Sequence, residues 1–590
     1  MNLSGIGADI DRILYPYLSV NSETCTDGEK EAERFILGVL GGMEYFREHE
    51  DHFGAFPVPG DPFGRSVCWG LVRGNSSCAE LQEACIEEDS LDCGSRELSG
   101  LQEACTEEGC FASGSGERTV VLVHHYDVVN TEDFKDLKDL AFSPGPLEEA
   151  LLKMKHGLHE EAATDLVSGG FLFGRGTADM KAGGAIQLAL LDRFSKQDGP
   201  QGNLLLLAVP DEENLSAGMR GAVLLLSELK QRFSLDYIYA IDSEPHQRKD
   251  TDTGVISEGS VGKTLAFVYV RGFLSHAGKV FEGLNPLSVL ARIAGMTELS
   301  EAFSDTALGE ASPPPTWLYL RDRKEGYDVS MPLGAGGCLS ILTLDSGPAE
   351  IMEALMTISR EAFRKTIDCM NESYESFCKN SGREHAGLPW EARVCSFGEL
   401  LAEADRDNGD LFARRYSEKL NDIAAEIYGK RMDFIEAGFL LTEFVMEYID
   451  DLSPRVVLGL VPPYYPNTSN IMLDEEQNSC PGLADKLISF ALDEFGQEYS
   501  RESFFTGISD MSYFSLRGAA MVEKTLSDNM PLYGKAYSIP LAEIEGLSMP
   551  CINIGPWGKD FHKLTERVCK ADLYERTPAL LAKAVEIILS

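Results

Sequence analysis

The chain has 590 residues, of which 44% are hydrophobic and 25% are charged, and its formal net charge is −43 at pH 7. This composition is typical of a folded protein with two or more domains, and it excludes an intrinsically disordered chain. The acidic excess also argues against binding nucleic acid, because contact with phosphates requires a basic face.

The N-terminal stretch MNLSGIGADIDRILYPYL lacks the basic segment and apolar core of a secretory signal. No stretch approaches the roughly 20 apolar residues that span a bilayer. We therefore expect a cytoplasmic protein that does not bind membranes. The 14 cysteines, spread over a long chain, favour reduced thiols over a disulfide framework.

Five cysteines are concentrated in one acidic segment in which LQEAC occurs twice: Cys78, Cys85, Cys93, Cys105 and Cys110. Their spacing lacks the CxxC pairs of a zinc site. We interpret the region at about 75–117 as a surface insertion, in preference to a metal or redox site.

Strands and helices alternate in the first part of the chain. The predicted elements are a helix at 29–50, strands at 66–74 and 118–129, a helix at 180–194, a strand at 203–209, a helix at 218–233 and a strand from 237. This alternation predicts a layered α/β domain, in which ligand sites gather at the carboxyl ends of the strands.

The pattern changes near Glu258. A strand, a helix, a second strand and a long helix at 348–379 favour a separate sandwich of helices on an antiparallel sheet. Helical patterns resume near residue 400, a core strand is predicted at 453–466, and the chain closes with a strand, a loop and a helix beginning near His562. We therefore expect one domain to be formed by residues 1–258 and 399–590, and residues 259–398 to be inserted in it.

Histidine and acidic residues recur at the ends of the apolar strands. They are His125 and Asp127 in VHHYDVV, Asp179 in GRGTADMKAGG, Glu212 and Glu213 in PDEEN, Glu244 in DSEP, and His562 near the C-terminus. Singly, each is an ordinary strand-end residue. Together, adjacent carboxylates such as these repel one another unless a cation lies among them, and imidazole with carboxylate suits Zn²⁺, Co²⁺ or Mn²⁺.

The ordered motifs HxDVV, GRGxxDMKxG, PDEExxxxG, SEP and GPxGxxxH resemble those of the M20 family of di-zinc metallopeptidases and amidohydrolases. The stretches VPPYYPNTSN and FFTGISDMSYF are most similar to its arginine-utilisation (RocB-type) branch. The resemblance implies an α/β fold: a three-layer, zinc-exopeptidase-like catalytic domain at 1–258 and 399–590. The inserted α+β, ferredoxin-like domain at 259–398 would be the lid or dimerisation domain.

The resemblance also implies a ligand set. Asp179 would bridge two divalent metal ions, with Zn²⁺ expected and Co²⁺ or Mn²⁺ as alternatives. His125 and Glu244 would bind one ion, and Glu213 and His562 the other. The peptide bond between Asp179 and Met180 would be cis, and Asp127 would accept a hydrogen bond from His125 and fix its ring.

The remaining roles follow from the same resemblance. Glu212 would act as the general base for a metal-activated water. His276, in SHAG on the lid, would stabilise the oxyanion from the other subunit of a homodimer, or a monomer would rearrange its lid. We expect a hydrolase that cleaves the amide (peptide or N-acyl) bond of a short peptide or small amino-acid derivative. The alternative is a non-catalytic, metal-binding regulatory or scaffold protein of amino-acid utilisation.

Overall fold

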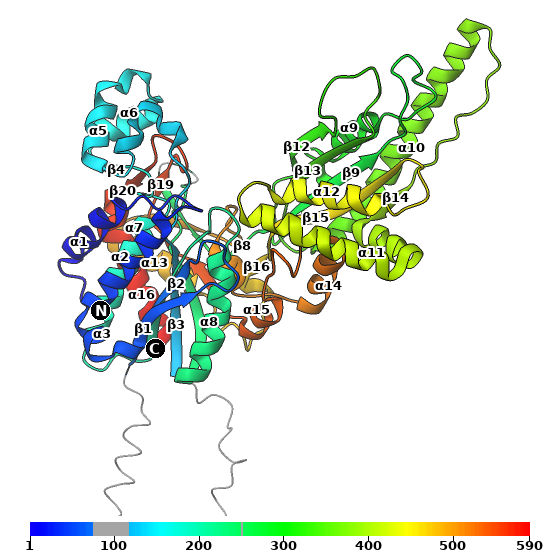
Figure 1. Ribbon diagram of the computed structural model, residues 1–590. Helices are drawn as coiled ribbons and strands as arrows, with labels where there is room; N and C mark the ends of the chain where they lie inside the picture. The colour runs from blue at the N-terminus through cyan, green and yellow to red at the C-terminus, as the bar shows by residue number, and fades with distance from the viewer. Residues whose placement is uncertain (75–116, 249, 251) are drawn as a thin grey trace, which may run out of the picture.

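The computed structural model describes residues 1–74, 117–248, 250 and 252–590. The five clustered cysteines of the predicted insertion lie outside these residues. The described chain has a mixed α/β fold with two large sheets that lie apart from each other (Figure 1). Among the described residues, no helix is long and apolar enough to cross a membrane.

The first unit is built on an eight-stranded sheet. In spatial order its strands are β1 (Phe53–Pro57), β2 (Ser66–Val72), β5 (Asn203–Val209), β3 (Glu117–His125), β6 (Leu235–Asp242), β18 (Cys551–Asn553), β7 (Thr253–Ser257) and β17 (Glu498–Glu502). The four central strands β5, β3, β6 and β18 run parallel. Their carboxyl ends therefore meet at one edge of the sheet.

Helices cover both faces of this sheet, which explains why β5 is apolar from Leu204 to Val209. Leu204 and Leu206 pack in the core of one face, and Leu205 and Leu207 in the core of the other. The first face is covered by α1 (Ile6–Leu18), α2 (Gly28–Gly42), α7 (Lys181–Ser195), α13 (Leu483–Phe495) and α16 (Thr577–Leu589). The second face is covered by α8 (Ala217–Phe233).

The second unit is built on a five-stranded sheet. In spatial order its strands are β12 (Thr316–Asp322), β13 (Gly334–Thr343), β9 (Gly262–Arg271), β15 (Arg455–Tyr465) and β14 (Val394–Ser396). All neighbours are antiparallel except β14 and β15. One face packs on α9 (Pro286–Thr297) and α10 (Pro348–Ser381), and the other on α11 (Phe397–Tyr428) and α12 (Phe434–Met446).

The division of the chain between the two sheets differs from the expected boundary at residue 398. Strand β15 lies beyond it, yet pairs with β9 in the second sheet, and α11 and α12 cover the same sheet. The chain then returns to the first sheet through β17 and β18. The core strand at 453–466 was predicted, but its sheet was not, because an apolar run does not specify its partner.

The predicted helix beginning near His562 is wrong. Asp560 and His562 both have left-handed backbone conformations, with φ of 54° and 62°. Such conformations end regular helical structure for non-glycine residues. The chain instead passes through turns into the short strand β20 (Arg567–Cys569), and helical structure begins only after this strand, with the π-helical segment Asp572–Arg576 that leads into α16 at Thr577.

Candidate metal centre

His125 is the last residue of β3, at the edge where the parallel strands end, and its side chain is fully buried. Its Nδ1–H donates to the main-chain carbonyl of Asp127 at 3.0 Å. Because Nδ1 is engaged by this carbonyl, Nε2 is the ring nitrogen that faces the site. The preceding His124 points to the other face, against Gln187, so only one histidine of the pair faces the carboxylates.

Asp179 lies between two histidines from distant parts of the chain. Its Oδ1 is 3.0 Å from His125 Nε2, and its Oδ2 is 3.1 Å from His562 Nε2. The peptide bond that follows Asp179 is cis, as the family resemblance implied. One carboxylate thus faces both imidazoles, the arrangement that a bridging ligand requires.

Each histidine also has a second carboxylate neighbour. Glu244, after β6, places Oε1 3.4 Å from His125 Nε2, and Glu213, after β5, places Oε1 3.2 Å from His562 Nε2. The ring geometry of His562 favours a hydrogen bond to Asp179, so the buried Glu213 Oε1 has no hydrogen-bond partner in the described part of the chain. The five predicted ligands therefore lie together.

Two groups of three potential ligands have atoms within 4.8 Å of one another among the described residues: His125 with Asp179 and Glu213, and His125 with Glu212 and Glu244. Imidazole nitrogen and carboxylate oxygen are the donors that zinc and other divalent transition metals accept. The donor set and its burial therefore fit divalent cations.

The electrostatics of the cluster reflect crowded carboxylates. Burial raises the pKa of Glu244 well above its usual range; nearby His125 opposes this shift and Asp179 reinforces it. Asp179 holds the pKa of His562 up, to about 10, through their hydrogen bond, and Glu213 adds to the effect. The cluster therefore holds protons on side chains that could bind a cation, and a bound cation would displace these protons.

Glu212 adjoins the cluster without joining the bridge. Its Oε2 is 4.0 Å from His125 Nε2, and only 9% of its surface is exposed. Burial raises the Glu212 pKa well above its usual range, His125 opposes the shift, and Glu244 and Glu213 add to it. A buried carboxyl group with a raised pKa beside potential metal ligands can accept and hold a proton.

Asp127 differs from expectation. Its carboxylate is 3.7 Å from His125 Nδ1, beyond hydrogen-bond distance, and the ring is held by the Asp127 carbonyl instead. The Asp127 side chain accepts the backbone N–H groups of Glu212, at 3.1 Å, and Glu213, at 3.2 Å. It therefore fixes the loop that carries these two glutamates.

The same loop is anchored by a buried ion network. Asp211, in a left-handed conformation with φ of 69°, accepts from Arg65 Nη1 at 2.6 Å and from the N–H of Ala217 at 3.1 Å. Arg65 also contacts Glu29 and Asp61. Asp211 directly precedes Glu212 and Glu213, and its charge is neutralised by Arg65.

Two supporting carboxylates were not found from the sequence. Glu566 accepts the N–H groups of Ala178 and Asp179, both at 3.3 Å, and pairs with Arg175 at 2.5 Å. Asp510 is fully buried, and neither of its carboxylate oxygens has a hydrogen-bond partner among the described residues. Burial raises the Asp510 pKa, Asp242 adds to the shift and His125 opposes it, so Asp510 lies in the field of the cluster. The only sequence signal for Asp510 was its place in FFTGISDMSYF.

His276 is not brought to the cluster within this chain. It lies in the second unit, in a loop that pairs with Ser330, and its Nδ1 accepts the N–H of Gly278 at 3.0 Å. Among the described residues, it makes no hydrogen bond or ion pair with any of the five predicted ligands. Its expected role therefore depends on a second subunit or on a movement of the second unit.

Comparison with known proteins agrees with this geometry. A profile of the peptidase family M20/M25/M40 matches residues 121–582. The chain is 31% identical over 579 residues to the uncharacterized protein YqjN of Bacillus subtilis (strain 168), covering 98% of this chain and 96% of YqjN. It is 27% identical over 588 residues to protein RocB of the same organism, covering 98% of this chain and 95% of RocB.

A more limited similarity extends to succinyl-diaminopimelate desuccinylase of Psychromonas ingrahamii (strain DSM 17664 / CCUG 51855 / 37). The identity is 34% over 163 residues, which cover 27% of this chain and 41% of the desuccinylase. The match to the family profile spans most of the chain, and the similarity to RocB agrees with the branch inferred from the motifs. The chain belongs to the peptidase family M20/M25/M40.

Proposed function

We propose that the chain is a hydrolase that uses two divalent metal ions to cleave the amide bond of a short peptide or an N-acyl amino acid. The observation that carries the proposal is the contact of Asp179 with both His125 and His562, each of which has a second carboxylate beside it. In the proposal, His125 and Glu244 hold one ion, Glu213 and His562 hold the other, and Asp179 bridges them. Zinc is the expected metal.

When bound, such ions supply Lewis acidity, which acidifies water and polarises a carbonyl group. Glu212 then takes the proton of the attacking water at a side-chain oxygen and delivers it to the departing nitrogen. Its neighbour Glu213 cannot share this role, because its side chain is directed to His562. Asp127 contributes by holding the backbone of both glutamates in place.

The substrate class rests on chemistry and on relatives. Peptidases and deacylases both bring an amide carbonyl to the same cations, so the site suits either reaction. The similarity to a desuccinylase, whose name denotes removal of an acyl group from diaminopimelate, supports N-acyl amino acids as candidates. The likeness to RocB adds arginine derivatives to the compounds that we would test.

We also propose that the second unit acts as a lid and dimerisation domain. His276 lies there, apart from the cluster of its own chain. A homodimer in which the second unit of one subunit covers the site of the other would bring an imidazole N–H to the developing oxyanion. This arrangement would explain why a single chain leaves His276 without a partner in the cluster.

A zinc-loaded preparation tests the function directly. Dipeptides, N-acyl amino acids and arginine derivatives would be screened with the parent chain, with Glu212→Gln and with Glu228→Gln, an exposed glutamate on α8. We expect hydrolysis of at least one class, a loss of roughly 100- to 10,000-fold in kcat for Glu212→Gln, and no change for Glu228→Gln. Two bound metals without hydrolysis of any substrate would favour the regulatory or scaffold alternative.

A further inference from the structure

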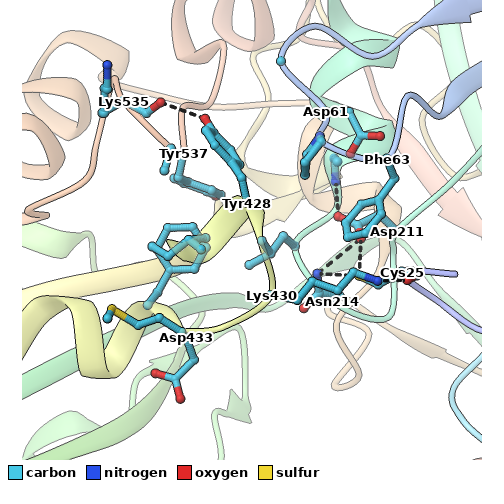
Figure 2. Close-up of a pocket in the computed structure, with 18 of the residues that line it drawn as sticks. Cys25, Asp61, Phe63, Asp211, Asn214, Tyr428, Lys430, Asp433, Lys535 and Tyr537 are labelled. Carbon is cyan, nitrogen blue, oxygen red and sulfur yellow. Dashed lines mark hydrogen bonds between the residues drawn. The ribbon is translucent and has the colours of Figure 1, made fainter. Parts of the chain in front are cut away.

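A cavity of about 820 Å³ lies apart from the metal centre, between the first and second units (Figure 2). Its walls come from the loop between β1 and β2, the loop after β5, the connection between α11 and α12, and the segment 534–538. None of the five predicted metal ligands lines it. Its volume lies in the range of about 300–1,000 Å³ that is usual for small-molecule sites.

Three cations in the cavity have no carboxylate partner among the described residues. Arg220 donates from Nη1 to the carbonyl of Ser538 at 2.9 Å, while its buried Nε has no hydrogen-bond partner within the described ranges. Lys430 donates to the carbonyl of Cys25 and lies 4.2 Å from the centroid of the Phe63 ring. Lys535 is the third; its main-chain carbonyl accepts from the Tyr428 hydroxyl and its N–H donates to Leu532, but its side chain has no hydrogen bond or ion pair among the described residues.

The other cationic side chains of the cavity are neutralised. Arg65 contacts Glu29, Asp61 and Asp211, Arg321 pairs with Glu436, and Arg431 pairs with Glu426. Of the lining carboxylates, Asp433 has no cation partner among the described residues; it caps α12 by accepting the N–H of Glu436. Figure 2 shows the Asp433 carboxylate turned away from Lys430. The side chains that line the cavity include six cations, Arg65, Arg220, Arg321, Lys430, Arg431 and Lys535, and four carboxylates, Asp61, Asp211, Asp433 and Glu436. The lining therefore has an excess of positive charge, in a chain whose net charge is −43.

Apolar and aromatic surface lies beside these cations. Phe63 packs under Lys430, and Tyr537 packs under Arg220 with 4.7 Å between the guanidinium carbon and the ring centroid. Phe434 and Ile427 contribute further apolar wall. Aromatic walls with a few polar groups are the usual composition of a small-molecule site, and arginine is suited to a carboxylate.

We propose that this cavity binds a small organic carboxylate with an aromatic body, at a site separate from the metal centre. The carboxylate pairs with the Arg220 guanidinium, Lys430 and Lys535 supply further positive charge, and the aromatic body packs against Tyr537 and Phe434. The site is independent of the proposed hydrolysis. Its walls include Asp211 and Asn214, which flank the two glutamates assigned to the reaction.

The test uses 3-phenylpropionate as the anionic probe and 3-phenylpropanamide as its neutral counterpart. Binding to the metal-free full-length chain would be measured by isothermal titration calorimetry. The matched variants are Arg220→Met and Arg232→Met. Arg232 is on the same helix, lies 4.7 Å from the Phe233 ring centroid and donates to the main-chain carbonyl of Asp51. It also pairs with the Asp51 carboxylate at 3.5 Å, and it does not line the cavity.

We expect the acid to bind and the amide not to bind. Arg220→Met should weaken binding of the acid roughly tenfold or more, because a charge-assisted hydrogen bond is lost, and Arg232→Met should leave it unchanged. Lys430→Met, at an exposed position, should also weaken binding and serves as the second variant if Arg220→Met lowers the thermal unfolding temperature.

The Asp179→Asn variant distinguishes binding in this cavity from binding at the metal centre. This variant should bind the acid as tightly as the parent chain does. The proposal is overturned if the acid fails to bind at millimolar concentration, if the amide binds equally well, or if Arg220→Met and Lys430→Met bind as the parent does. It is also overturned if Asp179→Asn alone abolishes binding, because the probe would then occupy the metal centre.

Discussion

The role of Asp127 can be tested sharply, because the structure and the family resemblance assign it different partners. In the structure, its two oxygens each accept one backbone N–H, from Glu212 at 3.1 Å and from Glu213 at 3.2 Å. Asp127→Asn keeps one acceptor oxygen and replaces the other with an NH₂ group, which cannot accept. One buried N–H is therefore left unsatisfied, at a cost of about 1–3 kcal/mol.

In the proposed site, this free-energy cost should weaken the binding of the ion that Glu213 would hold. If all of it appears as weaker metal binding, the affinity drops by roughly 5- to 150-fold. The ion beside His125 should be affected much less, because the ring is held by the Asp127 carbonyl, which the substitution keeps. A role in orienting His125 through the carboxylate would give the opposite pattern.

The assay is zinc titration against a competing chelator in two single-site backgrounds. In the Glu244→Gln background, the remaining ion should lie at Glu213 and His562. Adding Asp127→Asn to this background should lower the zinc affinity by the full factor given above. In His562→Ala, the remaining ion lies at His125, and the same addition should change the affinity little. Asp305→Asn is the matched control, since Asp305 accepts three backbone N–H groups in the second unit. A loss confined to the His562→Ala background would refute the reasoning.

Three further predictions follow from the described contacts. Metal content, measured by mass spectrometry of metals after dialysis, should fall from two ions per chain to one in Glu244→Gln and in His562→Ala. In Asp179→Asn it should fall to near zero. Equal losses in all three variants would contradict the bridging role of Asp179. Burial raises the pKa of Glu29, which lies beside Arg65, to about 8. The folded state therefore favours the protonated carboxyl group. The contribution of Glu29 to stability is fully present below its unfolded pKa near 4.5 and is lost as the pH rises through about 8. The melting temperature of the parent should therefore fall more steeply between pH 5 and 8 than that of Glu29→Gln, by roughly one to a few degrees, and parallel curves would count against this account. Finally, light scattering of the purified protein should give twice the chain mass, and a monomer at all concentrations would remove the proposed contribution of His276 across subunits.

Much of the first unit could be predicted from the sequence, because each signal was local. The leucine run at 204–207 is apolar on both faces, and the carboxylates that follow it mark the carboxyl end of a buried parallel strand. The same reasoning located His125 and Glu244 at neighbouring strand ends. Their convergence followed from the rule that parallel strands end at one edge of a sheet.

The features that were missed depend on contacts between distant segments. Asp211 pairs with Arg65, 146 residues away, and Glu566 supports the backbone of Asp179 across a separation of 387 residues. No local pattern marks either partner. The turn at His562 was predicted as a helix because its two left-handed residues, Asp560 and His562, are not glycine. Aspartate and histidine adopt this conformation more often than most residues, but they signal it much more weakly than glycine does.

The central claim is that two cations bind between residues contributed by five distant segments. The most direct measurement is anomalous diffraction at the zinc edge from crystals grown with excess zinc. We predict two peaks, one bounded by His125, Asp179 and Glu244 and the other by His562, Asp179 and Glu213. Peaks elsewhere, or these five side chains without any peak among them, would contradict the claim.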